Sequence, residues 1–450
     1  MGLKSSQMTQ ILVLGAGRSA TSLIDYLLAN TQALQWELVV ADKSLELAQQ
    51  KVNGHTRGRA VAFDLNHENE VSRLIKEATL VISLLPARFH PTVGRICLQF
   101  GKSLLTASYV SPQMQELHED VVSRGLLFLN ECGLDPGLDH MTAMSALNKV
   151  RELPEAEIRS FISYTGGLMA PESEDNPWNY KFTWNPRNVV LAGKETAQFI
   201  RNGRYKYIPY HRLFTRLEKV QVEGYGEFEG YANRDSLKYR QLYGLQDVST
   251  LIRGTLRRPG FCEAWNVFVQ LGLTDDSYSL KDLSNMTYRD FINTFLYFHP
   301  HKSVEEKLCD YLNLPTTGDI MNKLKWLGIF ENVPVALQQG SPADILQHIL
   351  ESKWYLGSQD KDMIVMQHQL GYLESGLETT LSMSLVSKGD DTQNTAMSKT
   401  VGWPLAIAAK LILTGKIQDT GVKVPLTEQY YAPILHELRH LGVQFIEKEL

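Results

Sequence analysis

The chain has 450 residues, of which 43% are hydrophobic, and its formal net charge is −5 at pH 7. This length exceeds that of one compact domain, so two or three domains are expected. The negative charge argues against a nucleic-acid partner, which requires a basic surface. The four cysteines lie far apart without a CxxC pair, a pattern typical of buried thiols in a reducing compartment rather than of disulfides or a zinc site.

Two absences in the sequence bear on location and on chemistry. No window approaches ~18 consecutive apolar residues, and the first ten residues are polar where a signal peptide would be apolar. We therefore expect a cytoplasmic protein with no membrane partner. No HExxH, GxSxG or cluster of metal ligands is visible, which disfavours metallohydrolases and serine hydrolases and predicts no metal.

The first predicted strand, residues 11–14, runs into a glycine-rich turn. Gly15 allows the tight turn, Gly17 lets backbone N–H groups approach a pyrophosphate at a helix N-terminus, and Ala20 keeps that helix close to the strand. The pattern predicts a dinucleotide-binding βαβ unit; the alternative is an ordinary βαβ unit without a nucleotide. Residues expected to bind the cofactor are Gly15, Gly17, Arg18, Ser19, Ala20, Asp42, Leu84, Leu85 and Pro86.

The second predicted strand, residues 38–41, ends at Asp42. A carboxylate at this place accepts hydrogen bonds from the adenosine ribose hydroxyls and repels a 2′-phosphate, so NAD is expected to be favoured. Lys43 and Ser44 follow and could partly neutralise and bind such a phosphate. NADP therefore remains possible as the cofactor.

The following segments alternate between helix and strand, which predicts a parallel sheet. Ligands bind at the carboxyl ends of such strands, and three strand ends are expected to meet there, at residues 85–86, 108–109 and 133–137. The predicted helices are 44–52 and 67–77, and the predicted strands are 60–63, 80–85, 103–106 and 126–129.

Beyond residue 152 the pattern changes to strands with long loops, beginning with a strand at 161–164. Helical periodicity dominates residues 247–355, a strand returns at 362–366, and a largely apolar helix at 395–415 is expected to pack back onto the nucleotide domain. The predicted domains are a nucleotide-binding domain (1–150 with 391–450), an α+β domain (151–246 and 356–390) and a helical insertion (247–355).

Arginines and histidines supply further candidates. Arg234, Arg253 and Arg257 are expected in loops or at element edges, where arginine can bind carboxylates with two parallel hydrogen bonds; the alternative is solvated surface charge. His90 and His140 could approach the cofactor cleft, although His140 fits a helix-surface or capping residue better.

Several segments together closely resemble the glutamate-forming saccharopine dehydrogenase family, and the resemblance spans nearly the whole chain. General Rossmann-type proteins have no Asn-Arg-Asp-Ser or Arg-Gly-Thr-Leu-Arg element, so these motifs are specific. The resemblance implies a Rossmann-type nucleotide domain completed by the C-terminal segment, plus an α+β substrate and dimerisation domain that carries the helical insertion. The matching segments are residues 81–86, 106–109, 131–140, 163–172, 233–236, 253–257 and 361–366.

The resemblance also implies a reaction in lysine metabolism and a homodimer. Saccharopine is oxidised with NAD or NADP and hydrolysed to glutamate and 2-aminoadipate 6-semialdehyde, or formed in reverse. Many relatives have a cysteine where this chain has Thr165, so a thiol there is not essential if the resemblance holds. The implied substrate residues are Ser108, Tyr109, Leu134, Asp135, Arg234, Thr255, Leu256 and Arg257.

The implied chemistry needs a group that moves protons, because hydride leaves only when the amine lone pair is free. Asp135 is the first candidate and Tyr109 the second; the alternative role for Asp135 is to cap a helix or form the turn before Pro136. Two other functions stay open: a related oxidoreductase acting on a polyamine conjugate, which the arginines oppose, and a nucleotide-binding relative without turnover.

Overall fold

The computed structural model describes residues 9–450, so most of the polar N-terminal stretch lies outside the described residues. The chain divides into two compact units. The first contains the chain up to Pro154 together with Leu385–Ile446, and the second contains Glu155–Ser384 and Glu447–Leu450. Each unit is described by itself below.

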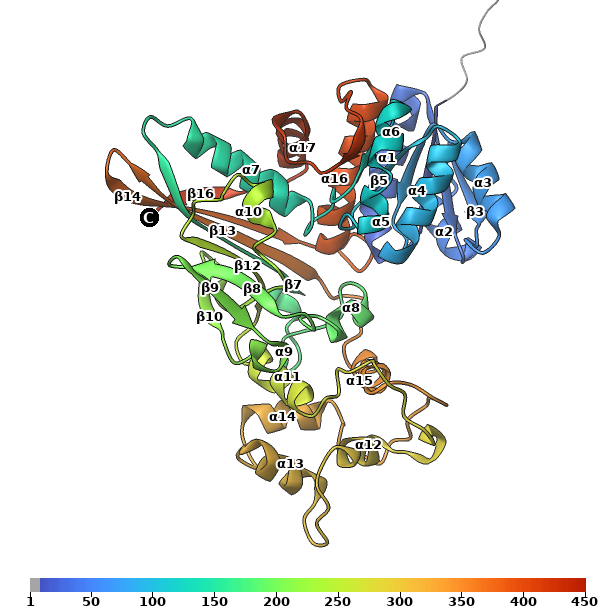
Figure 1. The fold of residues 1–450 in the computed structure, drawn as a ribbon. Helices are drawn as coiled ribbons and strands as arrows, with labels where there is room; N and C mark the ends of the chain where they lie inside the picture. Colours follow the sequence, from blue (N-terminus) through green and yellow to red (C-terminus); the bar gives the residue numbers. More distant parts are fainter. Residues whose placement is uncertain (1–8) are drawn as a thin grey trace, which may run out of the picture. The chain divides into compact units, whose positions relative to one another are not determined.

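The first unit is built on a seven-stranded sheet in which all neighbouring strands are parallel (Figure 1). Its order is β15-β6-β5-β4-β1-β2-β3, so β15, a strand of the chain's C-terminal segment, extends the N-terminal sheet. This confirms the predicted Rossmann-type domain completed by the C-terminal segment. The strands are β1 (Thr9–Leu14), β2 (Trp36–Asp42), β3 (Gly58–Ala62), β4 (Leu80–Ser83), β5 (Ser103–Thr106), β6 (Leu127–Leu129) and β15 (Gly421–Lys423).

Helices cover both faces of this sheet, because side chains of successive strand residues point to opposite faces. On one face, Leu12 and Leu14 of β1 join a buried cluster with side chains of α3 to α6. Ile11 and Val13 are equally buried and belong to the other face. The helices are α1 (Thr21–Leu34), α2 (Leu45–Val52), α3 (Glu68–Glu77), α4 (His90–Gln99), α5 (Pro112–Gln115), α6 (His118–Ser123), α7 (Leu138–Arg151), α16 (Ala396–Leu413) and α17 (Glu428–His440).

Helix α16 packs tightly on α1, as its apolar pattern predicts. The Ser398 hydroxyl accepts a hydrogen bond from the Ser22 amide and donates one to the Ser22 hydroxyl, both at 2.9 Å. A Cβ at Gly402 would lie 2.8 Å from the backbone nitrogen of Leu23, so only glycine lets the two helices approach this closely. The C-terminal segment therefore contributes both a strand and a buried helix to the nucleotide-binding fold.

The second unit contains a nine-stranded mixed sheet. Seven strands follow the order β10-β11-β12-β7-β13-β14-β16, and β8 pairs with β12 and β9 outside this path. The central pair, β7 and β12, is parallel, while β13 runs antiparallel to β7. The strands are β7 (Glu157–Met169), β8 (Ala197–Arg201), β9 (Arg204–Ile208), β10 (Glu218–Val222), β11 (Gly226–Ala232), β12 (Thr250–Arg257), β13 (Asp362–Glu374), β14 (Leu377–Lys388) and β16 (Ile446–Glu449).

Strand β12 corrects two expectations from the sequence. Residues 250–257 are not part of the helical region, and Arg253 lies inside a central strand rather than in a loop or at an element edge. Arg257 is the last residue of that strand and so does lie at an element edge. The sequence hides the strand because Gly254 interrupts its apolar run. The ring of Tyr164 covers that glycine so closely that a Cβ there would lie 2.3 Å from a ring carbon. The strand exists because its neighbours bury it, which local pattern does not reveal.

The longer helices of this unit follow β12 and enclose an aromatic core. Trp178, Trp265 and Trp354 are each 1% exposed or less and pack with Phe261. None of the helices within residues 9–450 is long and apolar enough to cross a membrane. The helices of this unit are α8 (Pro186–Val190), α9 (Tyr210–Leu213), α10 (Tyr239–Leu242), α11 (Phe261–Gln270), α12 (Tyr288–Thr294), α13 (Val304–Leu312), α14 (Asp319–Trp326) and α15 (Pro342–Glu351).

Candidate active site

The glycine-rich turn lies at the carboxyl end of β1, where it is fixed by the neighbouring strands. The Gly15 amide donates to the Ala41 carbonyl at 2.8 Å, and the Leu84 amide donates to the Leu14 carbonyl at 2.8 Å. Gly15 has φ +105°, and a Cβ there would meet the Leu84 carbonyl at 3.2 Å. Both the positive φ and the close approach of Leu84 require glycine.

The next glycine leaves space for a ligand. Gly17 is exposed, and a Cβ built on it would have no atom within 4 Å. It precedes the short 3-10 helix Arg18–Ala20 that leads into α1, and no side chain caps this N-terminus. Backbone N–H groups at an uncapped helix start attract phosphate, so the turn fits the pyrophosphate of a dinucleotide.

The Asp42 carboxylate is held by backbone amides. Its Oδ2 accepts a hydrogen bond from the Ala16 amide at 2.7 Å, and its Oδ1 accepts one from the Ser44 amide at 2.9 Å. The Ser44 hydroxyl in turn accepts from Leu47 and caps α2. Asp42 therefore supports the glycine turn and the start of α2, and each of its oxygens already has a donor.

Two candidate catalytic residues, from the loops that follow β5 and β6, contact each other. The Tyr109 hydroxyl donates a hydrogen bond to Oδ1 of Asp135 at 3.1 Å, and both side chains are partly buried. Helix α7 is capped at Gly137, whose amide donates to Asp139 at 2.6 Å. Asp139 therefore serves the helix start, and the Asp135 carboxylate accepts from a phenol that can share in proton transfer.

The Ser108 hydroxyl contacts His90, a buried histidine that the sequence indicated only as a residue near the cofactor cleft. His90 Nε2 lies 2.8 Å from the Ser108 hydroxyl and 3.1 Å from the Thr106 hydroxyl, and Nδ1 lies 3.1 Å from the Ser83 hydroxyl. Burial lowers the pKa of His90 to about 4, so the imidazole is neutral at physiological pH. A neutral ring surrounded by hydroxyls positions Ser108 and is unsuited to act as a base itself.

His140 differs from the expectation of a surface or capping residue. Its side chain is 1% exposed, and its Nε2 lies 2.7 Å from Oε2 of Glu131. Glu131 and His140 lie nine residues apart, on the loop after β6 and on α7, and local periodicity does not show that the fold pairs them. Leu134 is also buried, and its carbonyl accepts from the Asp139 amide at 3.0 Å.

The predicted arginines of the second unit occupy unlike environments. Arg234 is exposed on a loop with φ +49°, and its carbonyl accepts from the Gln198 amide at 2.8 Å. Arg253 is 8% exposed, with its guanidinium 4.0 Å from the centre of the Tyr239 ring. Of these two, only Arg234 presents its side chain to solvent.

Arg257 is enclosed by aromatic side chains. It is 4% exposed, and its guanidinium carbon lies 5.3 Å from the ring centres of Tyr180 and Phe261. One nitrogen donates to the Leu256 carbonyl at 3.0 Å. Thr255, by contrast, is partly exposed and lies beside Thr165 in the parallel register of β12 and β7. Thr165 thus occupies a place next to a predicted substrate residue.

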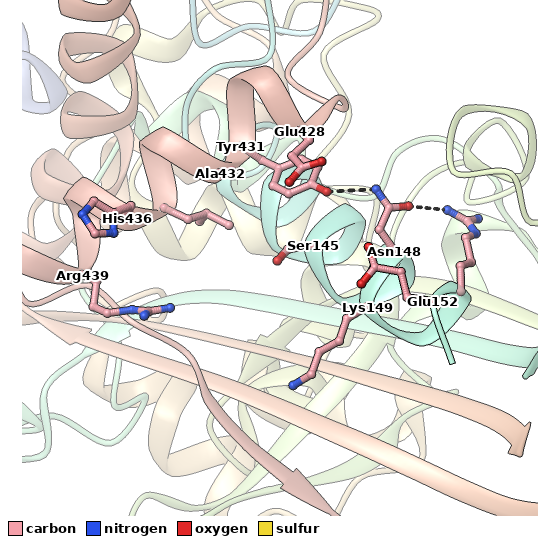
Figure 2. A pocket seen from close by; sticks show the side chains of 11 residues that line it. Ser145, Asn148, Lys149, Glu152, Glu428, Tyr431, Ala432, His436 and Arg439 are labelled. Atoms are coloured by element: carbon pink, nitrogen blue, oxygen red, sulfur yellow. Dashed lines mark hydrogen bonds between the residues drawn. The ribbon is translucent and has the colours of Figure 1, made fainter. Parts of the chain in front are cut away.

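A separate groove of about 550 Å³ runs between α7 and α17 in the first unit (Figure 2). The Asn148 side chain bridges its two helices by donating to the Tyr431 hydroxyl at 2.9 Å. None of the predicted site residues lines it. No group of three or more possible metal ligands occurs among residues 9–450.

Comparison with models of protein families shows to which family the chain belongs. The family model described as "Saccharopine dehydrogenase C-terminal domain" matches residues 133–443, and the one described as "Saccharopine dehydrogenase NADP binding domain" matches residues 11–129. The chain belongs to the saccharopine dehydrogenase family. The resemblance derived from the sequence motifs is thereby confirmed.

Individual relatives agree with this family. The saccharopine dehydrogenase [NADP(+), L-glutamate-forming] of Schizosaccharomyces pombe is 32% identical, with 98% of this chain and 99% of that protein covered. The mitochondrial alpha-aminoadipic semialdehyde synthase of Rattus norvegicus is 35% identical over 98% of this chain, which spans only 48% of that protein. The apo saccharopine dehydrogenase (L-Glu forming) of Saccharomyces cerevisiae superimposes with a TM-score of 0.88 at 30% identity, covering 98% and 100% of the two chains.

These comparisons overturn the expected preference for NAD. The matched nucleotide domain is described as NADP-binding, and the S. pombe and S. cerevisiae relatives are named for NADP(+). The structure supplies the physical reason. The prediction assumed that Asp42 reaches the ribose hydroxyls, whereas both carboxylate oxygens accept backbone hydrogen bonds. An acid engaged in this way provides weak grounds for excluding a 2′-phosphate.

Proposed function

We propose that this protein oxidises saccharopine with NADP and releases glutamate and 2-aminoadipate 6-semialdehyde, or catalyses the reverse condensation. Membership of the family and similarity to glutamate-forming relatives along their full length support the proposal. Within the molecule, the main support for the proposal is the Tyr109–Asp135 hydrogen bond at the carboxyl end of the nucleotide-binding sheet. This pair can supply the proton transfers that the reaction requires.

The reaction has two stages that both move protons. When bound, the nicotinamide supplies the acceptor for a hydride from the carbon that becomes the aldehyde. Asp135 accepts the proton of the secondary amine, which frees the nitrogen lone pair to form the C=N bond. Water then adds to that carbon and loses one proton to solvent, and the Tyr109–Asp135 pair returns a proton to the nitrogen. The C–N bond breaks as the remaining hydroxyl proton leaves, which gives the aldehyde and releases glutamate.

Substrate recognition rests on the carboxylates of saccharopine. Ser108, Tyr109, Leu134 and Asp135 are the proposed contacts in the first unit, and Ser108 is held in place by neutral His90. In the second unit the proposed contacts are Arg234, Thr255, Leu256 and Arg257. Exposed Arg234 is the one suited to bind a carboxylate with two parallel hydrogen bonds through its side chain.

The proposed cofactor contacts follow from the geometry of the glycine turn. The backbone from Gly15 to Ala20 would hold the pyrophosphate, and Leu84, Leu85 and Pro86 would lie along the neighbouring strand end. Arg18 and Lys43 are exposed cations next to the turn and to Asp42, and we assign them to the 2′-phosphate of NADP.

The direct test is a spectrophotometric assay of the purified chain with saccharopine and either oxidised cofactor. Saccharopine-dependent reduction of NADP, accompanied by glutamate release, is expected. Activity with carboxynorspermidine but none with saccharopine would identify a polyamine enzyme, and binding of saccharopine without reduction would identify a relative without turnover. Either result overturns the proposal.

Two further properties are proposals with separate tests. A cytoplasmic location is tested by fractionation of cells that express the protein at its natural level. A homodimer is tested by light scattering of the purified chain, which distinguishes one subunit from two by mass.

A further inference from the structure

The loop that carries Ser108 and Tyr109 is fixed by one buried carboxylate residue of the first unit. The backbone amide of Glu131 donates to the Ser108 carbonyl at 3.1 Å, and its Oε1 accepts from the Val110 amide at 3.0 Å. Glu131 thus holds the residues on both sides of Tyr109. Its backbone holds the preceding residue and its side chain holds the following one.

Glu131 is itself held from the other side. Oε2 lies 2.7 Å from Nε2 of His140, and the two residues are 8% and 1% exposed. A carboxylate buried this deeply needs a partner on each oxygen, and here the Val110 amide and the imidazole provide them. His140 lies on α7, so the chain of contacts joins this helix to the Tyr109 loop.

The backbone of Glu131 adopts a conformation that is unusual for a residue with a side chain. Its φ is +52°, a region that favours glycine and strains other residues. A glutamate stands at a position where glycine would be easier for the backbone. The contacts to Val110 and His140 give the physical reason for a long acidic side chain.

We propose that Glu131 is a positioning residue for the reaction: braced by His140, it sets the Tyr109 loop so that the phenol meets Asp135. Glu131 has no contact with the reacting atoms in this scheme and acts through Tyr109. The inference rests on the proposed function, because it assigns a purpose to the Tyr109–Asp135 contact.

Two variants of Glu131 distinguish a role in positioning the Tyr109 loop from a direct effect of the negative charge. Glu131→Gln keeps the length of the side chain and an oxygen for the Val110 amide, and Glu131→Asp keeps the charge but is too short to reach both partners. We expect kcat for saccharopine to fall about 10- to 100-fold in Glu131→Asp and only a few-fold in Glu131→Gln, because small misplacements of a catalytic group are costly. The opposite ranking would show that the charge acts directly and would overturn the inference.

A second background tests whether the effect passes through Tyr109. In the Tyr109→Phe background, Glu131→Asp should lower kcat by threefold or less. A change of this size is about the experimental scatter of a double-mutant cycle. An equal loss in both backgrounds would mean that Glu131 merely supports the fold. Asn148→Ala on the same helix removes the bond to Tyr431 and should leave kcat and KM unchanged.

A measurement without substrate keeps the inference testable if saccharopine is not oxidised. In protein labelled at the tyrosine ζ-carbon, Tyr109→Phe identifies the Tyr109 NMR signal. Glu131→Asp should shift this signal, and Asn148→Ala should not. An unshifted signal in folded Glu131→Asp would overturn the positioning role, while absence of wild-type turnover with saccharopine would count against the proposed function alone.

Discussion

The carboxylate of Asp42 accepts a hydrogen bond from the Ala16 amide at 2.7 Å, so the second strand holds the glycine turn that follows the first. Its other oxygen accepts from Ser44 at the start of α2. This acid therefore shapes the phosphate-binding turn. Its contribution to cofactor choice through the ribose is correspondingly reduced, which agrees with the NADP-dependent relatives.

Asp42→Ala should weaken the binding of NADP and of NAD alike. The reason is that the turn proposed to bind their shared pyrophosphate loses its hydrogen bond to Asp42. Loss of hydrogen bonds to a charged acceptor costs about 1.5–3 kcal/mol each, or roughly 10- to 100-fold in affinity. Fluorescence titration with both reduced cofactors measures the effect. Tighter NADP binding in the variant, with weaker NAD binding, would show that Asp42 repels the 2′-phosphate after all.

Lys43→Ala should weaken the binding of NADP without changing the affinity for NAD, because we assign the exposed ammonium to the 2′-phosphate. An exposed charge–charge contact is worth up to about 1 kcal/mol, or about fivefold in Kd at low salt. The matched control is Lys76→Ala, which removes an exposed lysine of α3. If both variants raised the Kd for NADP equally, Lys43 would act only through the general surface charge and not through a contact with the 2′-phosphate.

Asp135→Asn should lower kcat for saccharopine about 100- to 10,000-fold, the usual range for a general acid or base, while the melting temperature stays near that of the wild type. The fold should persist because α7 is capped at Gly137 with Asp139. Steady-state kinetics and calorimetry on one preparation measure both quantities. A lower melting temperature with unchanged turnover per folded molecule would make Asp135 a structural residue.

Arg234→Lys should raise KM for saccharopine by the loss of a charge-assisted contact, ~1.5–3 kcal/mol, because an ammonium cannot replace the two parallel bonds of a guanidinium. Its exposure predicts no change in the melting temperature. Arg204→Lys, at another exposed arginine of this unit, serves as the control. A KM unchanged from the wild type would remove the Arg234 side chain from substrate binding.

His90 predicts a pH dependence of stability. Its folded pKa is lowered to about 4 by burial, against an unfolded value near 6.5. Between these values the unfolded chain binds a proton at His90 and the folded chain does not. The free energy of unfolding therefore falls as the pH drops through this window, by at most roughly 3 kcal/mol from this group.

The His90→Gln variant removes this titration. Urea unfolding at pH values near 7 and near 4.5 should show a smaller loss of stability on acidification than in the wild type. His67→Gln removes an exposed histidine of the same unit and should leave the wild-type difference intact. A full-sized loss in His90→Gln would assign the acid sensitivity to other groups.

Local sequence was enough to predict most of the nucleotide-binding unit. Apolar strands that break into Gly15 and Gly17 identify a βαβ turn because the pyrophosphate needs close backbone approach, and that requirement is written in consecutive residues. Tyr109 and Asp135 were also found from the sequence, through family motifs. Their contact with each other was not, because they come from loops after different strands.

Only the tertiary structure decided the partners of the charged and polar side chains. The pattern around Asp42 indicates a ribose ligand, yet the fold gives both oxygens to backbone amides. The pattern around Gly254 hides a central strand that Tyr164 covers. Glu131 and His140 are only nine residues apart, yet no local pattern shows their pairing, since it depends on how the loop after β6 meets α7. The sequence determined which elements form, and packing determined what each polar group touches, because hydrogen-bond partners depend on positions that local periodicity does not encode.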